Sequence, residues 1–201
     1  QLRLPFVLDR CEQAFEDLTS VSFLDIGCGG GLLSESIAQH GSKVVGIDAA
    51  EKNIRIGSAH QAGADLDLQY VHTTLETWTD PRQFDVVLNM EVVEHVENLQ
   101  WFMEMACNRV RPGGLMFRAT INRTVFSALT AKFAAEYVLK LLPIGTHQWR
   151  KFVKPQELTE LVHYFGLDTE NPLGVSVNPF SRQMKISPFT GANYMLVAKK
   201  R

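Results

Sequence analysis

A glycine-rich turn joins an apolar segment to an amphipathic one near the start of the chain. It lies in Phe23-Leu24-Asp25-Ile26-Gly27-Cys28-Gly29-Gly30-Gly31. Glycine is needed where a turn is tight or where a ligand approaches the backbone with no Cβ in the way. A dinucleotide-binding fingerprint would place a further glycine at position 32, where this chain has Leu32. The turn therefore predicts a strand–turn–helix ligand site, but not the dinucleotide version of it.

An acidic residue ends the second predicted strand, about 20 residues beyond the turn. It is Asp48, the last residue of Val44-Val45-Gly46-Ile47-Asp48. A carboxylate at this point can accept two hydrogen bonds from a ribose diol, which is how such folds anchor adenosine cofactors. An Asp at a strand end can instead cap the following helix. The turn and Asp48 together favour the ribose role, and Thr74-Leu75-Glu76, after the third strand, is the expected adenine contact.

Apolar and amphipathic segments alternate over the first 120 or so residues, the pattern of a parallel sheet with crossover helices. We expect strands at Ser22–Ile26, Lys43–Ile47, Leu68–His72, Phe84–Met90 and Leu115–Ile121, and later antiparallel strands at Gly174–Asn178 and Tyr194–Ala198. We expect helices at Leu32–His40, Lys52–Ala62, Leu99–Val110, Thr124–Leu142 and Pro155–Phe165, and a turn at Pro112-Gly113-Gly114. At 201 residues without a linker or repeat, the chain (1–201) is expected to form one α/β domain.

Composition limits the partners of the chain. The formal net charge of -2 gives no basic field for nucleic acid. Three cysteines (Cys11, Cys28 and Cys107) have no paired spacing, which favours a reducing compartment. No apolar run reaches the roughly 18–20 residues that span a bilayer. Because the chain opens at Gln1 rather than at a methionine, the lack of a targeting segment carries no weight.

A Glu-x-x-Glu-His cluster, Met90-Glu91-Val92-Val93-Glu94-His95, follows the fourth predicted strand at the edge where open α/β sheets bind ligands. On a helix, Glu91, Glu94 and His95 would share one face. Two carboxylates and an imidazole are an incomplete ligand set for a divalent ion, which leaves positions for water and a substrate oxygen. In the alternative, the carboxylates are solvated at a helix start and His95 is packed inside. We favour the metal site.

Further motifs appear in order along nearly the whole chain. They are Pro112-Gly113-Gly114, Thr120-Ile121-Asn122-Arg123, Ala135-Glu136-Tyr137, Gly145-Thr146-His147 and Asn193-Tyr194-Met195-Leu196. The glycine turn resembles motif I of the class I S-adenosylmethionine-dependent methyltransferases. With the Glu-x-x-Glu-His cluster and these later motifs, the chain resembles the ubiquinone biosynthesis O-methyltransferases.

The resemblance implies a Rossmann-like, doubly wound, mostly parallel sheet of seven strands, with an apolar helical insertion after strand five. It implies O-methylation of a polyprenyl catechol and of demethylubiquinol. It implies that S-adenosylmethionine is bound by Arg3, Gly27, Asp48 and Met90, together with Gly29 of the same turn. It also implies that Glu91, Glu94 and His95 hold Mg2+ or a similar ion and act in catalysis. Met90 has a plain core role as its alternative.

Such an ion has a chemical task. A phenol has a pKa near about 10, so at neutral pH it is a poor nucleophile toward a sulfonium methyl group. Coordination to a cation stabilises the phenolate and orients it. Without a metal, His95 alone would be the base that removes the phenol proton.

Thr124–Leu142 is strongly apolar apart from a stripe of Lys132, Glu136 and Lys140, spaced four residues apart. A helix of this kind is either buried in a core or in contact with something apolar. Trp149 and the basic residues Arg150, Lys151 and Lys154 follow, as suits an anionic bilayer surface. We expect residues 124–154 to meet a membrane. A lid helix packed on the sheet is the alternative.

Two other functions fit part of the pattern. A small-RNA 2′-O-methyltransferase shares Glu-x-x-Glu-His, but it needs basic surface and a further histidine such as His147, and this chain is net acidic. A non-catalytic membrane scaffold is disfavoured by the intact cofactor motifs. The expected partners are a polyprenylated phenol or quinol, an anionic membrane and other ubiquinone-biosynthesis proteins, with no nucleic acid. The expected location is peripheral, on the cytoplasmic face of a bacterial inner membrane or the matrix face of the mitochondrial one.

Overall fold

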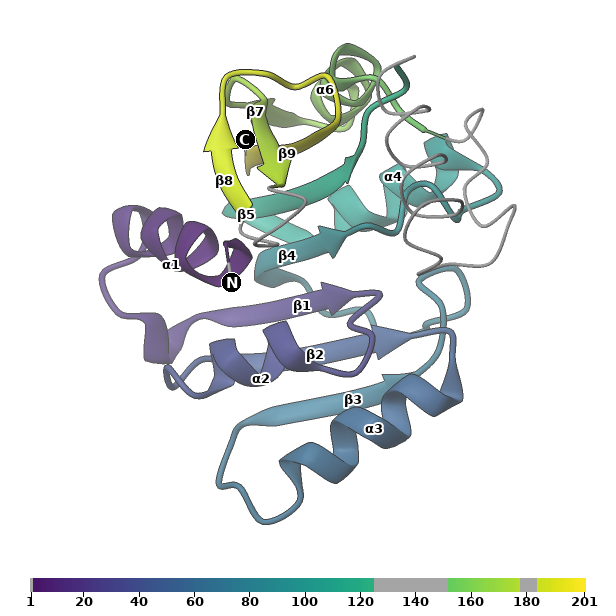
Figure 1. The fold of residues 1–201 in the computed structure, drawn as a ribbon. Helices are drawn as coiled ribbons and strands as arrows, with labels where there is room; N and C mark the ends of the chain where they lie inside the picture. Colours follow the sequence, from purple (N-terminus) through teal and green to yellow (C-terminus); the bar gives the residue numbers. More distant parts are fainter. Residues whose placement is uncertain (1, 125–151, 178–183) are drawn as a thin grey trace.

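The computed structural model describes residues 2–124, 152–177 and 184–201. In this part of the chain nine strands form one sheet, in the order β3-β2-β1-β4-β5-β9-β7-β8, with β6 paired to β9 (Figure 1). The parallel strands are β1 (Ser22–Ile26), β2 (Lys43–Asp48), β3 (Leu68–His72), β4 (Phe84–Met90) and β5 (Val110–Ile121). The antiparallel strands are β6 (Leu167–Thr169), β7 (Leu173–Val177), β8 (Met184–Ser187) and β9 (Asn193–Lys200).

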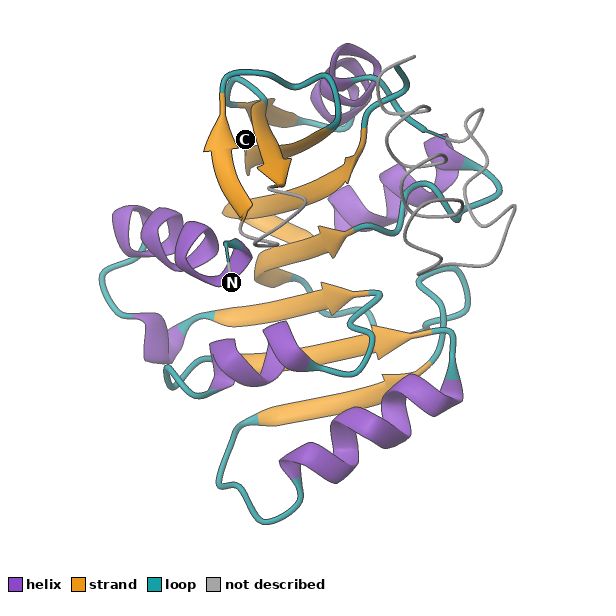
Figure 2. Cartoon of the chain, viewed as in Figure 1, coloured by secondary structure: helices purple, strands orange, loops and turns teal. Residues whose placement is uncertain are grey.

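Helices cover both faces of this sheet, which confirms the doubly wound α/β class (Figure 2). One face carries α1 (Arg3–Ala14), α2 (Leu32–Ala38) and α3 (Glu51–Gln61), with the short 3-10 helix η1 (Leu18–Ser20) before β1. The other face carries α4 (Leu99–Asn108) and α6 (Pro155–Tyr164). Side chains alternate between the two cores along each strand. On β4, Val86 and Leu88 pack in the core of α1 and α2, whereas Val87 packs in that of α4 and α6.

The chain direction across the sheet reverses at β1. From β1 it proceeds outward to β2 and β3, and then crosses back to place β4 on the other side of β1. In open α/β sheets such a reversal leaves a crevice beyond the carboxyl ends of the two central strands, where ligands bind. Gly27 directly follows β1 and Glu91 directly follows β4. The fold therefore brings the two main sequence motifs to the same edge of the sheet.

The described part of the chain differs from expectation in three respects. It has nine strands rather than seven, because the short strands β6 and β8 were not expected, and neither was α1. Pro112-Gly113-Gly114 is not a turn before β5 but an irregularity within it. The register moves from Phe84↔Val110 to Val86↔Leu115, so residues 111–114 bulge opposite Asp85. Gly113 permits this with a φ of 78°.

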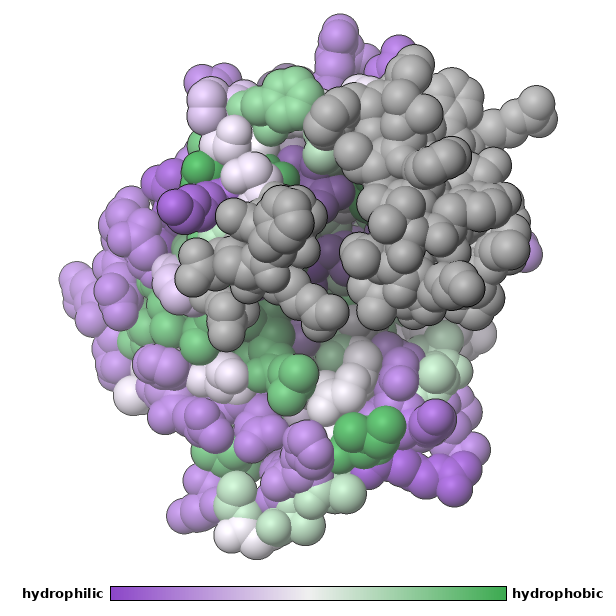
Figure 3. Space-filling model, viewed as in Figure 1, coloured by the Kyte–Doolittle hydropathy of each residue, from purple (hydrophilic) through white to green (hydrophobic). Residues whose placement is uncertain are grey.

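The expected helix over Thr124–Leu142, with Trp149, Arg150 and Lys151, lies outside the described residues. Beyond it, Phe152 and Val153 are buried in the core, and exposed Lys154 precedes α6. This end of the 124–154 segment is therefore part of the protein interior. Where the chain is described, no helix combines the length and apolar character needed to cross a bilayer. On the face drawn in Figure 3, hydrophobic side chains are interspersed with hydrophilic ones.

Candidate active site

A cavity of about 560 Å³ opens at the carboxyl ends of the central strands. Four carboxylates lie around it, those of Asp48, Glu76, Glu91 and Glu97, together with the imidazole of His95. Its described lining contains no lysine or arginine. The remaining lining residues are Ile26, Gly27, Ile47, Ala49, Thr73, Thr74, Leu75, Val92, Val96, Asn98, Trp101 and Phe102. The cavity is therefore acidic where it is described, with apolar walls.

The glycine turn reaches this cavity at Gly27, and two of its positions exclude a side chain. Gly27 has a φ of 72°, and a Cβ there would overlap Val92. Gly31 has a φ of 82°, and a Cβ there would overlap the ring of Tyr70, whose hydroxyl donates to the Gly31 carbonyl over 3.1 Å. The left-handed backbone and the close approach are the two conditions that require glycine. The tight turn expected from the sequence is confirmed.

Asp48 ties the glycine turn to the start of α3. Its Oδ2 accepts a hydrogen bond from the backbone N–H of Gly29 over 2.9 Å. Its Oδ1 accepts from the N–H of Ala50 over 2.8 Å and from Nδ2 of Asn53 over 3.0 Å. The carboxylate also faces the cavity. A carboxylate offers about four acceptor sites, so Asp48 retains capacity for a ligand donor after these three bonds.

Asp25 supports the same turn from behind. It is buried in β1, and Ser34 of α2 donates to its Oδ2 over 2.6 Å. Burial raises the pKa of Asp25 to about 6, and the nearby charge of Arg3 opposes that rise. The bond joins β1 to α2, the two elements on either side of the glycine turn.

The Glu-x-x-Glu-His segment is a bend at Glu91 followed by a turn over residues 93–95, so the helical arrangement that would align its side chains is not formed. Glu91 has a φ of 63° and forms an ion pair with Arg3. Glu94 is only 6% exposed, accepts from Oγ1 of Thr120 over 2.9 Å, and has its pKa raised by burial. His95 is exposed and lines the cavity. Because the backbone is not helical, the three side chains do not share one face.

The three residues do not fit a divalent ion in this arrangement. Glu91 is engaged by a guanidinium, and Glu94 is turned toward β5, where Thr120 occupies one of its oxygens. Across the described ranges, no group of three His, Cys, Asp or Glu side chains is arranged to hold a metal ion. The structure thus brings Glu91 and His95 to the cavity and leaves Glu94 behind them.

The remaining predicted cofactor residues lie around the cavity rather than in its lining. Arg3, at the start of α1, lines a small adjoining pocket that shares Glu91 with the main cavity. Met90 is buried in the core between the sheet and α1, and Gly29 contacts Asp48 through its N–H. Gly27 and Asp48 line the cavity directly. Thr74-Leu75-Glu76, the adenine contact predicted from the sequence, also lines it.

The first turn of α4 supplies a wall that the sequence analysis missed. Asn98 caps this helix by accepting from the N–H of Trp101 over 3.0 Å. Trp101 is half exposed and lines the cavity beside Phe102. An Asn cap directly after the Glu-x-x-Glu-His segment was a visible signal that the helix starts there. It follows that a tryptophan in the first turn faces the same edge of the sheet.

Comparisons with known proteins agree with this fold. Residues 3–171 match the family model of a methyltransferase domain. A ubiquinone biosynthesis O-methyltransferase of Sinorhizobium fredii is 47% identical over 99% of this chain and 84% of its own length. Among solved structures, a plantazolicin methyltransferase in complex with a triazolic desmethylPZN analog and SAH has a TM-score of 0.73 at 17% identity, covering 100% of this chain and 84% of its own. The magnesium protoporphyrin IX methyltransferase of Synechocystis PCC 6803 with bound SAH has a TM-score of 0.72 at 18% identity, covering 99% and 82%.

The solved structures establish the fold as that of the class I S-adenosylmethionine-dependent methyltransferases. The curated relative extends the likeness to the sequence of almost the entire chain. These comparisons give no support to a small-RNA methyltransferase or to a non-catalytic scaffold. The chain belongs to the ubiquinone biosynthesis O-methyltransferases.

Proposed function

We propose that this enzyme transfers the methyl group of S-adenosylmethionine to a ring hydroxyl of polyprenyl catechol and demethylubiquinol intermediates. The observation that carries the proposal is the acidic cavity beside the glycine turn, at the point where the strand order reverses. The ligand has a positive sulfonium and no phosphate. Carboxylates around a low-dielectric cleft favour a cation of this kind.

We assign the cofactor groups from the residues that surround the cavity. Asp48 has free acceptor capacity at its carboxylate and is the proposed ribose ligand. Thr74-Leu75-Glu76 is the proposed adenine contact, and the methionyl part lies toward Gly27 and Gly29 of the turn. Arg3 and Met90, which lie just outside the cavity lining, are proposed to contact the same end of the cofactor.

The reaction needs alignment and the removal of one proton. The phenolic oxygen attacks the methyl carbon, the carbon–sulfur bond breaks, and its electron pair returns to sulfur to give neutral S-adenosylhomocysteine. The phenol proton needs an acceptor, because a phenol has a pKa near about 10. His95 is exposed in the cavity, whereas Glu94 is buried and bonded to Thr120. We therefore assign proton removal to His95.

The test is a methyl-transfer assay on short-tailed catechol and demethylubiquinol analogues, read by mass spectrometry of the methylated product. Transfer to both analogues from S-adenosylmethionine is expected. Binding of S-adenosylhomocysteine without transfer to either analogue would contradict the proposed substrates while leaving the cofactor site in place.

A divalent ion such as Mg2+, held by Glu91, Glu94 and His95, is the alternative proposal to His95 acting alone as the base, and it needs the three side chains to rearrange from the positions described above. If the ion is required, excess chelator in the same assay abolishes turnover and leaves the affinity for S-adenosylhomocysteine unchanged by calorimetry. Binding of the ion would require Arg3 to release Glu91. Full turnover in chelator, with no metal found by elemental analysis, would count against the ion.

We propose that the basic residues after the apolar segment Thr124–Leu142 bind an anionic membrane. The enzyme would then be a peripheral protein on the cytoplasmic face of a bacterial inner membrane or on the matrix face of the mitochondrial one. Each basic residue near such a surface contributes about 1 kcal/mol, so replacing Arg150, Lys151 and Lys154 with Gln is expected to cost up to ~3 kcal/mol. That is roughly a hundredfold in partitioning. Sedimentation with cardiolipin-containing and with neutral liposomes measures this loss of partitioning.

A matched variant removes three exposed cations elsewhere. Lys43, Lys52 and Arg55 lie at the start of β2 and on α3, and their replacement with Gln lowers the net charge equally. If both triple variants lose the same binding, the attraction is general rather than local to residues 150–154. Association with other ubiquinone-biosynthesis proteins stays a prediction.

A further inference from the structure

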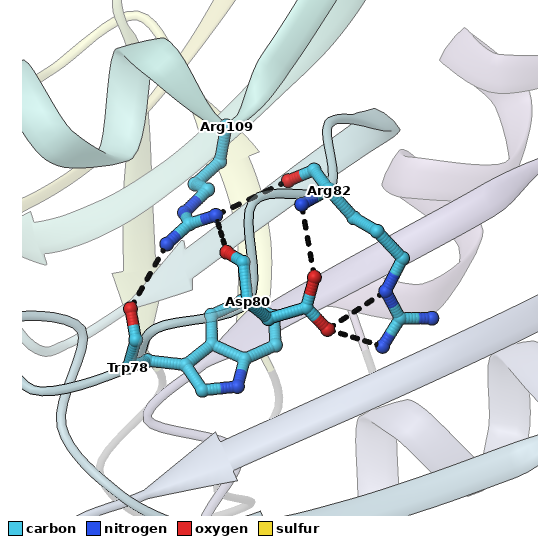
Figure 4. A network of polar contacts seen from close by, with 4 residues as sticks. All are labelled: Trp78, Asp80, Arg82 and Arg109. Atoms are coloured by element: carbon cyan, nitrogen blue, oxygen red, sulfur yellow. Dashed lines mark hydrogen bonds and ion pairs between the residues drawn. The ribbon is translucent and has the colours of Figure 1, made fainter.

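The connection between β3 and β4 divides into two halves with different surroundings. We call residues 73–83 the β3–β4 loop. Its first half, Thr73–Glu76, lines the cavity. Its second half, Trp78–Gln83, lies outside the cavity lining and runs past the end of α4 (Figure 4). What holds the second half therefore also limits the movement of the first.

Arg109, at the C-terminal end of α4, holds the second half through three backbone carbonyls. Its Nη2 donates to the carbonyl of Trp78 over 3.1 Å. Its Nη1 donates to the carbonyl of Asp80 and, over 3.3 Å, to that of Arg82. The guanidinium also lies 4.9 Å from the centre of the Trp78 ring. Figure 4 shows the single side chain reaching carbonyls at alternate positions of the loop.

Further contacts fix the same half against the sheet. The ring of Trp78 stacks on Phe84, with 6.1 Å between centroids. Arg82 pairs with Asp80 over 2.6 Å, and the hydrogen bond from Arg82 lowers the pKa of the Asp80 carboxyl. This pair joins two residues of the loop to each other. Arg109, in contrast, joins the loop to a different element.

The cavity half of the loop has its own short bonds. Thr73 donates its N–H to the carbonyl of Asp48 over 3.1 Å, and the N–H of Thr74 donates to Oγ1 of Thr77 over 3.3 Å. Leu75 is buried in the core. Thr77 is the one residue between the cavity half and the carbonyl of Trp78. The loop is thus fixed at Asp48 on one side and at Arg109 on the other.

We propose that Arg109 is a positioning residue for S-adenosylmethionine, which acts by holding Thr73–Glu76 in the shape that receives the adenine. This inference rests on the proposed cofactor site. Without Arg109, three carbonyls lose their donor and the loop gains conformations. Ordering them again when the cofactor binds costs affinity. Because Arg109 does not line the cavity, turnover at saturating cofactor is unaffected.

The test compares steady-state constants of Arg109→Gln with those of the parent enzyme. The KM for S-adenosylmethionine and the Kd for S-adenosylhomocysteine are expected to rise roughly tenfold, equivalent to about 1.4 kcal/mol. The kcat and the KM for the quinol analogue are expected to stay within about twofold. Arg109→Lys keeps the charge but loses the planar fork, so it is expected to recover only part of the affinity.

Arg82→Gln is the matched control, since it removes a neighbouring guanidinium but leaves all three carbonyl bonds of Arg109 intact. It is expected to keep the parent KM. Hydrogen exchange of residues 73–77 in Arg109→Lys gives a second readout if Arg109→Gln does not fold, and faster exchange there is expected. A lower Tm with an unchanged cofactor KM, or an equal effect from Arg82→Gln, would overturn the proposal. Failure of the parent enzyme to bind S-adenosylhomocysteine would instead reject the cofactor site itself.

Discussion

Replacing Asp48 with Ala is expected to weaken S-adenosylmethionine binding by roughly tenfold or more. The substitution removes a charge-assisted pair of hydrogen bonds to the proposed ribose. It also removes the acceptor for the N–H of Gly29 and for the start of α3, so the glycine turn loses a support of its own. Calorimetric titration with S-adenosylhomocysteine measures the loss.

Two further variants serve as comparisons. Asp48→Asn keeps one carbonyl oxygen as an acceptor but loses the charge, so it is expected to fall between Ala and the parent. Glu51→Gln removes an exposed carboxylate three residues away that does not line the cavity, and it should leave the affinity unchanged. Equal affinity for Asp48→Ala and the parent would remove Asp48 from the cofactor site.

Replacing Arg118 with Met is expected to stabilise the fold. Arg118 is only 2% exposed in β5, and its described hydrogen bonds go to the sulfurs of Met103 and Met116. A thioether is a weak acceptor. Burial lowers the pKa of Arg118 to about 10, so the side chain stays charged at neutral pH without a carboxylate in ion-pair range among the described residues. Replacing a buried ion pair with well-packed apolar side chains is often neutral or stabilising by about 1–4 kcal/mol, and within the described ranges Arg118 lacks even the partner that offsets the cost of burying a charge.

Thermal and urea unfolding measure the gain, which corresponds to a rise of roughly 2–4 °C in Tm for each kcal/mol. Arg55→Met is the control, since Arg55 is exposed on α3 and its described ion pair, with Glu51, lies within one helix. Its effect is expected to stay within about 0.5 kcal/mol. A less stable Arg118→Met would mean that contacts of the guanidinium outweigh the cost of burying it.

The central strands could be predicted closely from the sequence. The bounds of β1, β3 and β4 match the expected residues, and β2 extends one residue further to Asp48. These strands are apolar over most of their length because helices cover both faces of the sheet, so strand and burial signals coincide. The strands β6 and β8 have three and four residues, too few for a periodic pattern to appear.

The geometry after β4 could not be predicted in the same way. The spacing of Glu91, Glu94 and His95 is helical, but a sequence pattern does not report the left-handed backbone that Glu91 adopts. The partners of these side chains, Arg3 and Thr120, lie far along the chain. The same applies to Arg109, whose carbonyl partners begin 31 residues earlier. Contacts of this kind depend on the assembled sheet, not on local spacing.

The reversal of strand order at β1 also sets when the site can exist during folding. The glycine turn and Asp48 belong to the first strand–helix–strand unit, in which neighbouring segments pair. The opposite wall of the cavity follows β4. This strand pairs with β1 through contacts such as Phe23 with Val86, which are far apart in the sequence. Closing so long a loop is a slow, entropically costly event. A chain folded only as far as β3 would therefore lack the wall that follows β4, and the proposed cofactor cavity would be complete only once β4 pairs with β1.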